Sequence, residues 1–175
     1  MTKRKVFGIG LPKTGTTSLH TALHRLGYKV GLCEDIFKVI ELSTKVDAIT
    51  DGLTVPYVEA LDRLYPDAQF ILTLRDEKEW LDSCRRYYAR IKVETLSKRQ
   101  RWGRRVLWGM EEYDERIFHE VYHKTIWHTY EYFSSRPEKL LELFVCAGEG
   151  YELLCPFLGV PAISEPFPHE NRGAR

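Results

Sequence analysis

The residues best suited to chemistry gather near the N-terminus, in a loop rich in glycine and hydroxyl side chains. They form a single run: Pro12, Lys13, Thr14, Gly15, Thr16, Thr17 and Ser18. Glycine lets the backbone approach a ligand closely, hydroxyl groups donate hydrogen bonds, and lysine adds a positive charge. A loop of this composition predicts an anion-binding site, and phosphate is the anion that it fits best.

The elements on either side of this loop must aim its donors at one point. The apolar run over residues 6–9 predicts a buried strand. Leu19 and Leu23 stand at helical spacing, so we expect a helix that begins near residue 16 or 17. Such a helix directs its unpaired N–H groups and the positive end of its dipole into the loop. A strand, a glycine-rich loop and a helix in this order are typical of a phosphate cradle.

The loop departs from the Walker A pattern of nucleoside triphosphatases. Gly10 and Gly15 have the required separation, but Thr16 occupies the position of the lysine that would reach the β- and γ-phosphates. The lysine lies inside the loop, as Lys13, and this argues against ATP or GTP hydrolysis. A P-loop kinase or nucleotide hydrolase stays open as an alternative, with Asp76 as its Walker B carboxylate.

A second group of polar residues follows the apolar run 69–74, which predicts a central parallel strand. Arg75 comes directly after this strand, at the edge where open α/β sheets bind ligands. Ser83 lies two helical turns farther on and is expected to return to the same face. A guanidinium group and a hydroxyl suit a phosphate monoester. We also expect Asp76 to cap the following helix, with Glu79 completing a capping box.

These two groups of residues resemble the nucleotide site of the sulfotransferase family. Residues 12–18 resemble its 5′-phosphosulfate loop, and the seven-residue spacing between Arg75 and Ser83 is similar to its 3′-phosphate clamp. The resemblance implies a P-loop-type fold that binds 3′-phosphoadenosine 5′-phosphosulfate (PAPS). It implies that Lys13 contacts the bridging oxygen and the sulfuryl group, while the loop's amides and hydroxyls hold the 5′-phosphate.

The resemblance extends, more weakly, over residues 145–171. Cytosolic members carry an Arg-Lys-Gly loop near the C-terminus that wraps the 3′-phosphate. Asn171-Arg172-Gly173 stands at a similar point but lacks the lysine, which makes Arg172 a further candidate nucleotide contact.

Sulfuryl transfer needs a base that accepts the proton of the acceptor. Asp51, at the end of a predicted strand over 47–51, is our first choice by position, although it also suits a simple Asp-Gly turn. Glu34 and Asp35, after another predicted strand, are the alternatives. The cytosolic branch of the family has a histidine near this position and the polysaccharide-modifying branch a glutamate. His20 is expected to point out of the first helix.

Strands alternate with helices along the chain, which predicts a three-layer α/β/α fold with a central parallel sheet, like that of P-loop NTPases. The expected strands are 6–9, 28–32, 47–51, 69–74 and 139–145, and the expected helices are 16–26, 34–43, 56–65, 77–91, 114–134 and 148–158. Residues 1–175 are expected to form one domain, with about 92–135 as a helical, acceptor-side lid. The basic patch 102–105 suits two interpretations. It either gathers an anionic acceptor or nucleic acid, or it belongs to a solvated lid helix, and we favour the lid helix.

The net charge, the apolar segments and the cysteines narrow the range of functions and locations that fit the sequence. The net charge is +1, so no bulk field attracts nucleic acid. The N-terminus has no apolar signal segment, and no apolar run reaches the length of a membrane helix. The four widely spaced cysteines form no metal pattern and are expected to be reduced thiols. These features predict a cytoplasmic protein without a membrane span.

The sequence therefore predicts a PAPS-dependent sulfotransferase. The acceptor is a hydroxyl or amine on a small molecule, glycan or lipid. Lys13 and Asp51 are the catalytic residues, no metal is required, and a homodimer is possible. The alternatives are a P-loop kinase or hydrolase and a non-catalytic nucleotide-binding protein of the same fold.

Overall fold

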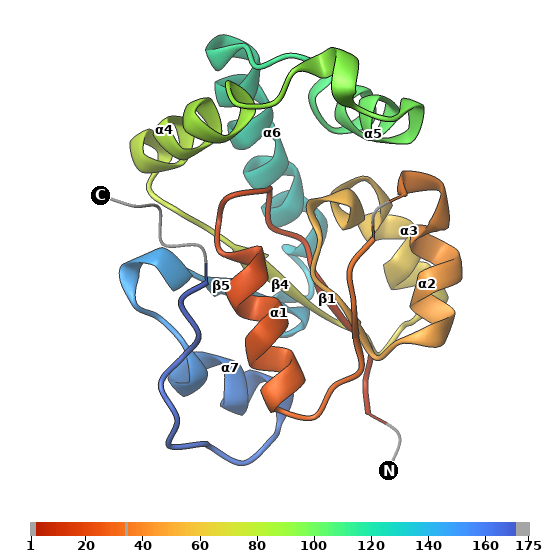
Figure 1. Ribbon diagram of the computed structural model, residues 1–175. Coiled ribbons are helices and arrows are strands. Elements are labelled where there is room, and N and C mark those ends of the chain that lie inside the picture. Colours follow the sequence, from red (N-terminus) through yellow and green to blue (C-terminus); the bar gives the residue numbers. More distant parts are fainter. Residues whose placement is uncertain (1–2, 34, 171–175) are drawn as a thin grey trace.

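The computed structural model describes residues 3–33 and 35–170, which form a parallel sheet covered by helices (Figure 1). The strands are β1 (Val6–Gly8), β2 (Val30–Gly31), β3 (Ala48–Ile49), β4 (Gln69–Thr73) and β5 (Leu140–Leu143). They lie in the order β2-β3-β1-β4-β5, and every neighbouring pair is parallel. The predicted α/β fold with a central parallel sheet is confirmed.

Helices cover both faces of the sheet and the edge at its carboxyl end. The α-helices are α1 (Thr16–Arg25), α2 (Val39–Lys45), α3 (Val58–Leu64), α4 (Glu77–Tyr88), α5 (Lys98–Trp108), α6 (Glu115–Phe133) and α7 (Tyr151–Leu158). The 3₁₀ segments are η1 (Ile36–Lys38), η2 (Gly52–Tyr57), η3 (Val93–Thr95), η4 (Pro137–Lys139) and η5 (Val145–Ala147).

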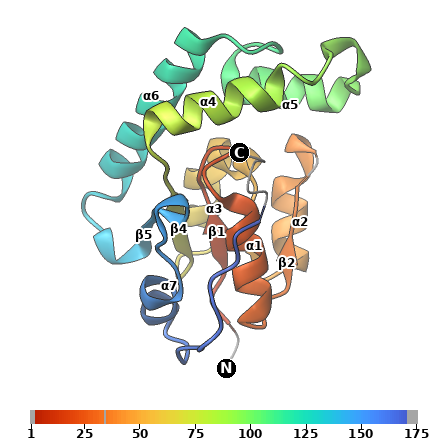
Figure 2. The ribbon, with the colours of Figure 1, turned by 60° about the vertical axis from the view of Figure 1, so that its left-hand side comes forward.

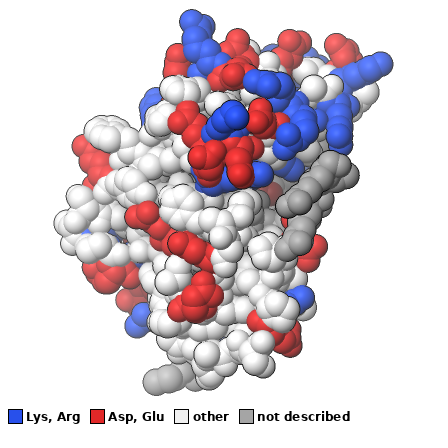
Figure 3. Space-filling view, turned by 90° about the vertical axis from the view of Figure 1, so that its left-hand side faces the viewer, with Lys and Arg blue, Asp and Glu red and all other residues white. Residues whose placement is uncertain are grey.

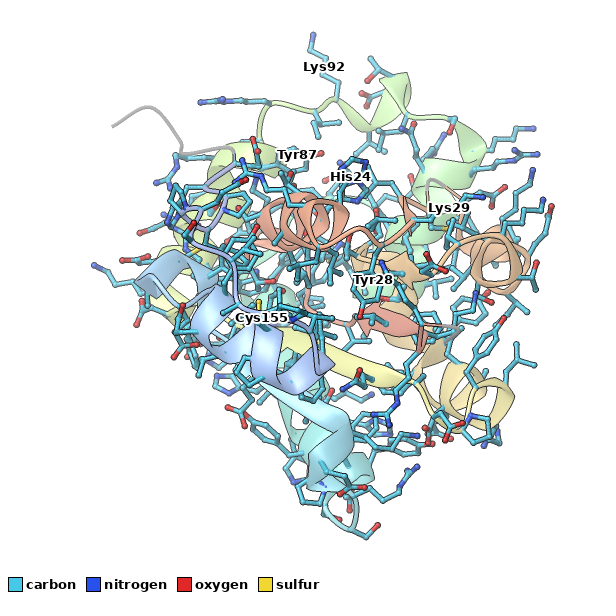
Figure 4. The ribbon with its side chains drawn as sticks, turned by 90° about the horizontal axis from the view of Figure 1, so that it is seen from below. His24, Tyr28, Lys29, Tyr87, Lys92 and Cys155 are labelled. Atoms are coloured by element: carbon cyan, nitrogen blue, oxygen red, sulfur yellow. The ribbon has the colours of Figure 1, made fainter. Side chains whose placement is uncertain are left out.

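Two apolar cores hold these layers together. On one face, α1 and α7 pack against the sheet in a core that includes Leu19, Leu154 and Ile71. Tyr28 and Cys155, labelled in Figure 4, belong to the same core. On the other face, α2, α3 and the end of α6 pack around Phe7 and Phe70. The side chains of these two cores bury apolar surface against both faces of the sheet and so stabilise the fold.

A third core joins α4, α5 and α6 into a helical layer above the carboxyl ends of the strands (Figures 1 and 2). Trp80 is fully buried there, and the rings of Trp108 and Phe118 stack with centroids 4.0 Å apart. Aromatic pairs at this separation add to the stability gained from burial. The predicted lid segment is therefore an ordered layer with its own core.

Several predicted boundaries differ from the structure. The helix expected to reach residue 91 ends at Tyr88. The expected helix 34–43 is a 3₁₀ turn followed by α2, and Pro56 lies inside η2 rather than in the first turn of an α-helix. Asp76 does cap α4 by accepting a hydrogen bond from the Glu79 amide at 3.0 Å. The Glu79 side chain pairs with Arg75 instead of completing the capping box.

The arginines in and just before the basic patch 102–105 are largely paired with acidic residues. Arg101 and Arg105 both contact Glu111, at 2.7 and 2.6 Å, and Arg99 contacts Asp35 at 3.3 Å. On the face seen in Figure 3, Lys and Arg side chains mix with Asp and Glu over the helical layer at the top. The pairing of the α5 arginines with Glu111 suits the solvated lid helix better than a nucleic-acid patch.

Two further properties follow from the described residues. None of their helices is long and apolar enough to cross a membrane. No disulfide links the four cysteines, all of which are described; three are buried, and Cys146 is exposed.

Candidate functional site

A cleft of about 1070 Å³ opens at the carboxyl end of the sheet, between the N-terminal loop and the helical layer. Six parts of the chain form its walls: the loop with the start of α1, the turn after β3, the residue Arg75 after β4, the second half of α4, the segment after β5 and the segment after α7. Its lining residues are Pro12, Lys13, Gly15, Thr16, Thr17, Ser18, Asp51, Gly52, Arg75, Ser83, Tyr87, Tyr88, Val145, Cys146, His169 and Glu170.

The loop is held in shape by contacts from neighbouring elements. The buried Trp80 indole donates from Nε1 to the Pro12 carbonyl oxygen at 2.9 Å. The Thr14 hydroxyl donates to the Leu11 carbonyl at 2.7 Å and lies 2.6 Å from the Thr73 hydroxyl on β4. Thr14 is thus buried beneath the loop. An anion donor is expected to line the cleft, and the Thr14 hydroxyl does not.

The backbone of the loop adopts two left-handed conformations. Gly15 has φ of 108°, and a Cβ at this position would lie 2.8 Å from the Val145 Cβ, so only glycine fits. Lys13 has φ of 75°, which is uncommon for a residue with a side chain. Strain of this kind persists only where the surrounding contacts enforce it, and it is concentrated at functional sites.

Helix α1 begins directly after this turn, with Gly15 as its N-cap. Glycine has no side chain to cap the helix, so no side chain occupies the N–H groups of the first turn at this cap, and Thr16 and Thr17 line the cleft beside them. The Ser18 hydroxyl accepts a hydrogen bond from the Glu170 amide at 3.0 Å. These donors and the helix dipole favour an anion at this point.

Lys13 projects into the cleft beside the end of α4. Its Nζ lies 4.6 Å from the centroid of the Tyr87 ring. Burial lowers the pKa of this lysine below 10.5, and the positive charges of Arg75 and Arg86 lower it further. The negative charge of an anion bound in the cleft would offset both effects, because it favours the protonated lysine.

Arg75 and Ser83 line the same cleft as the loop, as the spacing of these residues predicted. Arg75 is held by Glu79, whose carboxylate accepts from Nε and from one terminal nitrogen, both at 3.3 Å. The guanidinium group is largely covered, whereas Glu79 is mainly exposed. The arginine is therefore oriented before any ligand arrives, and an exposed carboxylate competes for it.

The candidate bases occupy different positions. Asp51 lines the cleft and also caps η2 by accepting from the Leu53 amide at 2.9 Å. Asp35 lies outside the cleft and accepts from the Phe37 amide at 3.1 Å. His20 does not point outwards as expected, since its Nδ1 lies 3.2 Å from the Thr50 hydroxyl. Burial and then His24 lower the pKa of His20.

The two remaining predicted site residues, Glu34 and Arg172, lie outside the residues that the structure describes.

The comparison with known families identifies the family of the chain. The sulfotransferase-domain family model matches residues 5–39 and 32–175, which together cover nearly all of the sequence. The chain belongs to the sulfotransferase family. It is an enzyme of sulfuryl transfer, and the match gives no support to a kinase or nucleotide hydrolase.

Two solved structures share the fold of this sulfotransferase. A sulfotransferase from Alicyclobacillus acidocaldarius superposes with a TM-score of 0.63 at 17% identity, over 95% of this chain and 85% of that chain. Mouse sulfotransferase SULT7A1, complexed with PAP, gives a TM-score of 0.56 at 16% identity, over 95% of this chain and 61% of that chain. No curated protein matches the chain.

The sulfotransferase cleft also contains residues that the sequence analysis missed. Tyr87 and Tyr88 follow Ser83 by about one turn of α4, so helical spacing alone could have identified them. Cys146 follows β5 at the same edge of the sheet, which is a weaker signal. Glu170 reaches the cleft because the tail crosses α1, and no local pattern indicates that contact.

Proposed function

We propose that PAPS is the sulfuryl donor of this sulfotransferase and that the cleft binds it. The main support is that Lys13, Arg75 and the N-terminus of α1 line one cavity although they come from distant parts of the chain. A nucleotide with a sulfated phosphate at one end and a second phosphate at the other needs two separate sets of cationic and N–H donors. The donors of this cleft fit that requirement.

In this proposal the two ends of the nucleotide have different partners. The loop amides and the hydroxyls of Thr16, Thr17 and Ser18 hold the 5′-phosphate. Arg75 and Ser83 hold the 3′-phosphate. Pro12 and Gly15 shape the turn, Thr14 supports it from below, and Arg172 remains a candidate contact to the 3′-phosphate.

The donor supplies a sulfuryl group on a phosphate leaving group. The acceptor oxygen or nitrogen attacks sulfur, so that a bond to sulfur forms while the bond from sulfur to the bridging phosphate oxygen breaks. Lys13 stabilises the negative charge that develops on that oxygen. Asp51 accepts the proton of the acceptor, and adenosine 3′,5′-bisphosphate leaves. The scheme requires no metal.

The acceptor has a hydroxyl or amine on a small molecule, glycan or lipid. It approaches from the side of residues 92–135, which form the acceptor-side lid of a single domain 1–175. We place the enzyme in the cytoplasm, and a homodimer is compatible with the proposal.

Calorimetry against adenosine 3′,5′-bisphosphate and against ATP with magnesium tests the donor. We expect the bisphosphate to bind, and ATP to bind at least about tenfold more weakly because the loop lacks the Walker lysine. Transfer of labelled sulfate from PAPS to a panel of phenols, sugars and lipids then tests catalysis. Tight binding of ATP without binding of the bisphosphate would refute the proposal, as would transfer that survives Lys13→Ala unchanged.

A further inference from the structure

Three side chains with metal-binding chemistry meet outside the cleft, where α4 begins beside α6. Glu77 is the first residue of α4, and His119 and His123 lie one turn apart on α6. The Glu77 Oε1 lies 3.0 Å from the His119 Nε2 and 3.1 Å from the His123 Nε2. All three potential ligand atoms lie within 4.8 Å of one another.

These separations are close to those of a metal site. In a tetrahedral zinc site with bonds of about 2.0–2.1 Å, neighbouring ligand atoms are about 3.3 Å apart. The carboxylate oxygen already sits near that distance from both ring nitrogens, so a small outward shift would admit an ion. Without the ion, both ring nitrogens lie in direct contact with the carboxylate oxygen at these distances.

The chemistry of the ligands also selects the kind of ion. Two imidazole nitrogens and one carboxylate oxygen suit zinc and similar divalent transition metals, and not calcium or magnesium, which take oxygen ligands. The side chains are open to solvent, with exposed fractions of 52% for His119, 55% for His123 and 34% for Glu77. An ion can therefore enter, and water can complete the coordination.

We propose that Glu77, His119 and His123 form a binding site for a divalent transition metal ion such as Zn²⁺. Each imidazole then presents an unprotonated Nε2, and its proton moves to Nδ1 or to water. The ion would link the start of α4 to the middle of α6. Tyr122, between the two histidines, already ties α6 to the segment just before α4 by donating to the Arg75 carbonyl. The site is separate from the sulfuryl-transfer cleft, and the proposal does not depend on the identity of the donor.

Calorimetry with ZnCl₂ on the full chain, under reducing conditions, tests the site. We expect one ion per chain and a rise in the thermal midpoint of about 5–10 °C at a free zinc concentration of a hundred times Kd. His119→Ala, His123→Ala and Glu77→Gln should each weaken zinc binding at least about tenfold, since losing even a supporting partner of a metal ligand costs 10–100-fold. Circular dichroism should show that each variant stays folded.

His128→Ala is the matched control. His128 lies on the same helix, is similarly exposed and approaches Glu59 at 3.8 Å, so its loss should leave zinc binding unchanged. Absorption of the Co²⁺-loaded protein adds a test of the ligands: we expect a four-coordinate d–d spectrum without a thiolate charge-transfer band. Absence of binding, binding that survives in all three variants, or a thiolate band, which would indicate the exposed Cys146, would overturn the proposal.

Discussion

The Lys13 ammonium lies over the face of the Tyr87 ring, 4.6 Å from its centroid. The lysine comes from the loop after β1 and the tyrosine from the last turn of α4, so this contact joins two walls of the cleft. The electron-rich face of the ring attracts a cation without neutralising it. Lys13 is thereby held in the cleft with its full charge available to an anion, which a carboxylate partner would not allow.

Replacing Tyr87 with leucine removes this attraction and keeps a side chain of moderate size. Tyr87 is 46% exposed, so a cation–π contact of about 0.5–1 kcal/mol is expected. The kcat/KM for PAPS should fall about two- to fivefold, mainly through loss of lysine positioning. Tyr87→Phe keeps the ring and should retain the wild-type value. If the two variants behave alike, the hydroxyl or the bulk of the side chain matters, and the ring face does not.

Lys13 combines a catalytic charge with an unfavourable backbone conformation, and two substitutions separate these properties. Lys13→Ala and Lys13→Gly should both lower kcat by about 10²–10³, the loss typical of a donor that stabilises developing negative charge. Only glycine relieves the left-handed φ of 75°. Urea unfolding should therefore show Lys13→Gly to be more stable than Lys13→Ala by about 1 kcal/mol. Equal stability would mean that the loop relaxes in the variants.

The ion pair between Arg75 and Glu79 predicts that replacing the arginine and replacing the glutamate have opposite effects on nucleotide binding. Arg75→Ala should weaken binding of adenosine 3′,5′-bisphosphate about 10- to 100-fold, which corresponds to the loss of a charged hydrogen bond. Glu79→Gln removes the competing carboxylate but keeps a polar partner. Because Glu79 is exposed, the gain is small, and binding should tighten about two- to fivefold. Weaker binding in Glu79→Gln would show that the carboxylate orients the arginine more than it competes for it.

Asp51 both lines the cleft and caps η2, so its replacement must preserve one role while removing the other. Asparagine caps a helix about as well as aspartate but cannot accept a proton. Asp51→Asn should fold normally, bind the bisphosphate and lose about 10²–10⁴ in kcat. Asp51→Ala should in addition lower the free energy of unfolding by about 1 kcal/mol. An active Asp51→Asn enzyme would move the search for the base to another residue.

The parts of the site that sequence predicted correctly depend on neighbouring residues. The strand, the loop and the start of α1 follow from an apolar run, two glycines and helical spacing, all within residues 6–26. Arg75 and Ser83 reach the same cleft because carboxyl ends of parallel strands share one edge, a property of the fold class. Local pattern and topology together therefore predicted that the loop, Arg75 and Ser83, which we propose as phosphate donors, lie in one cleft.

The parts that were missed depend on contacts between distant residues. The direction of the Thr14 hydroxyl is set by Thr73, 59 positions away. The environment of His20 is set by Thr50, and Glu170 reaches Ser18 only because the tail returns across α1. A threonine or histidine has several possible partners, and its sequence neighbours do not determine which of them packing brings close.

A heavily paired acidic residue lies away from the cleft and gives a prediction about stability. Asp62 on α3 is buried and accepts hydrogen bonds from Lys139, from Arg136 at 2.5 Å and from Tyr132 at 2.9 Å. These contacts join α3 to the end of α6 and to η4, which follows it. Asp62→Asn should lower the free energy of unfolding by about 2–3 kcal/mol, because it leaves two cations without their counter-charge.

The control for this variant is Asp67→Asn, which alters an exposed carboxylate nearby and should change stability by less than about 0.5 kcal/mol.

The pH dependence of the stabilisation by Asp62 gives a second test. Burial alone would raise the pKa of Asp62, but hydrogen bonds from Lys139, Arg136 and Tyr132 outweigh it and hold the pKa below 3.8. The folded state therefore binds this proton less readily than the unfolded state, so the stabilisation is complete above pH 3.8 and is lost as the pH falls through the lower, folded-state pKa. Urea unfolding of wild type and Asp62→Asn should show a constant difference near neutral pH that shrinks below about pH 4. A difference that persisted at lower pH would mean that the variant is destabilised by packing and not by the loss of charge.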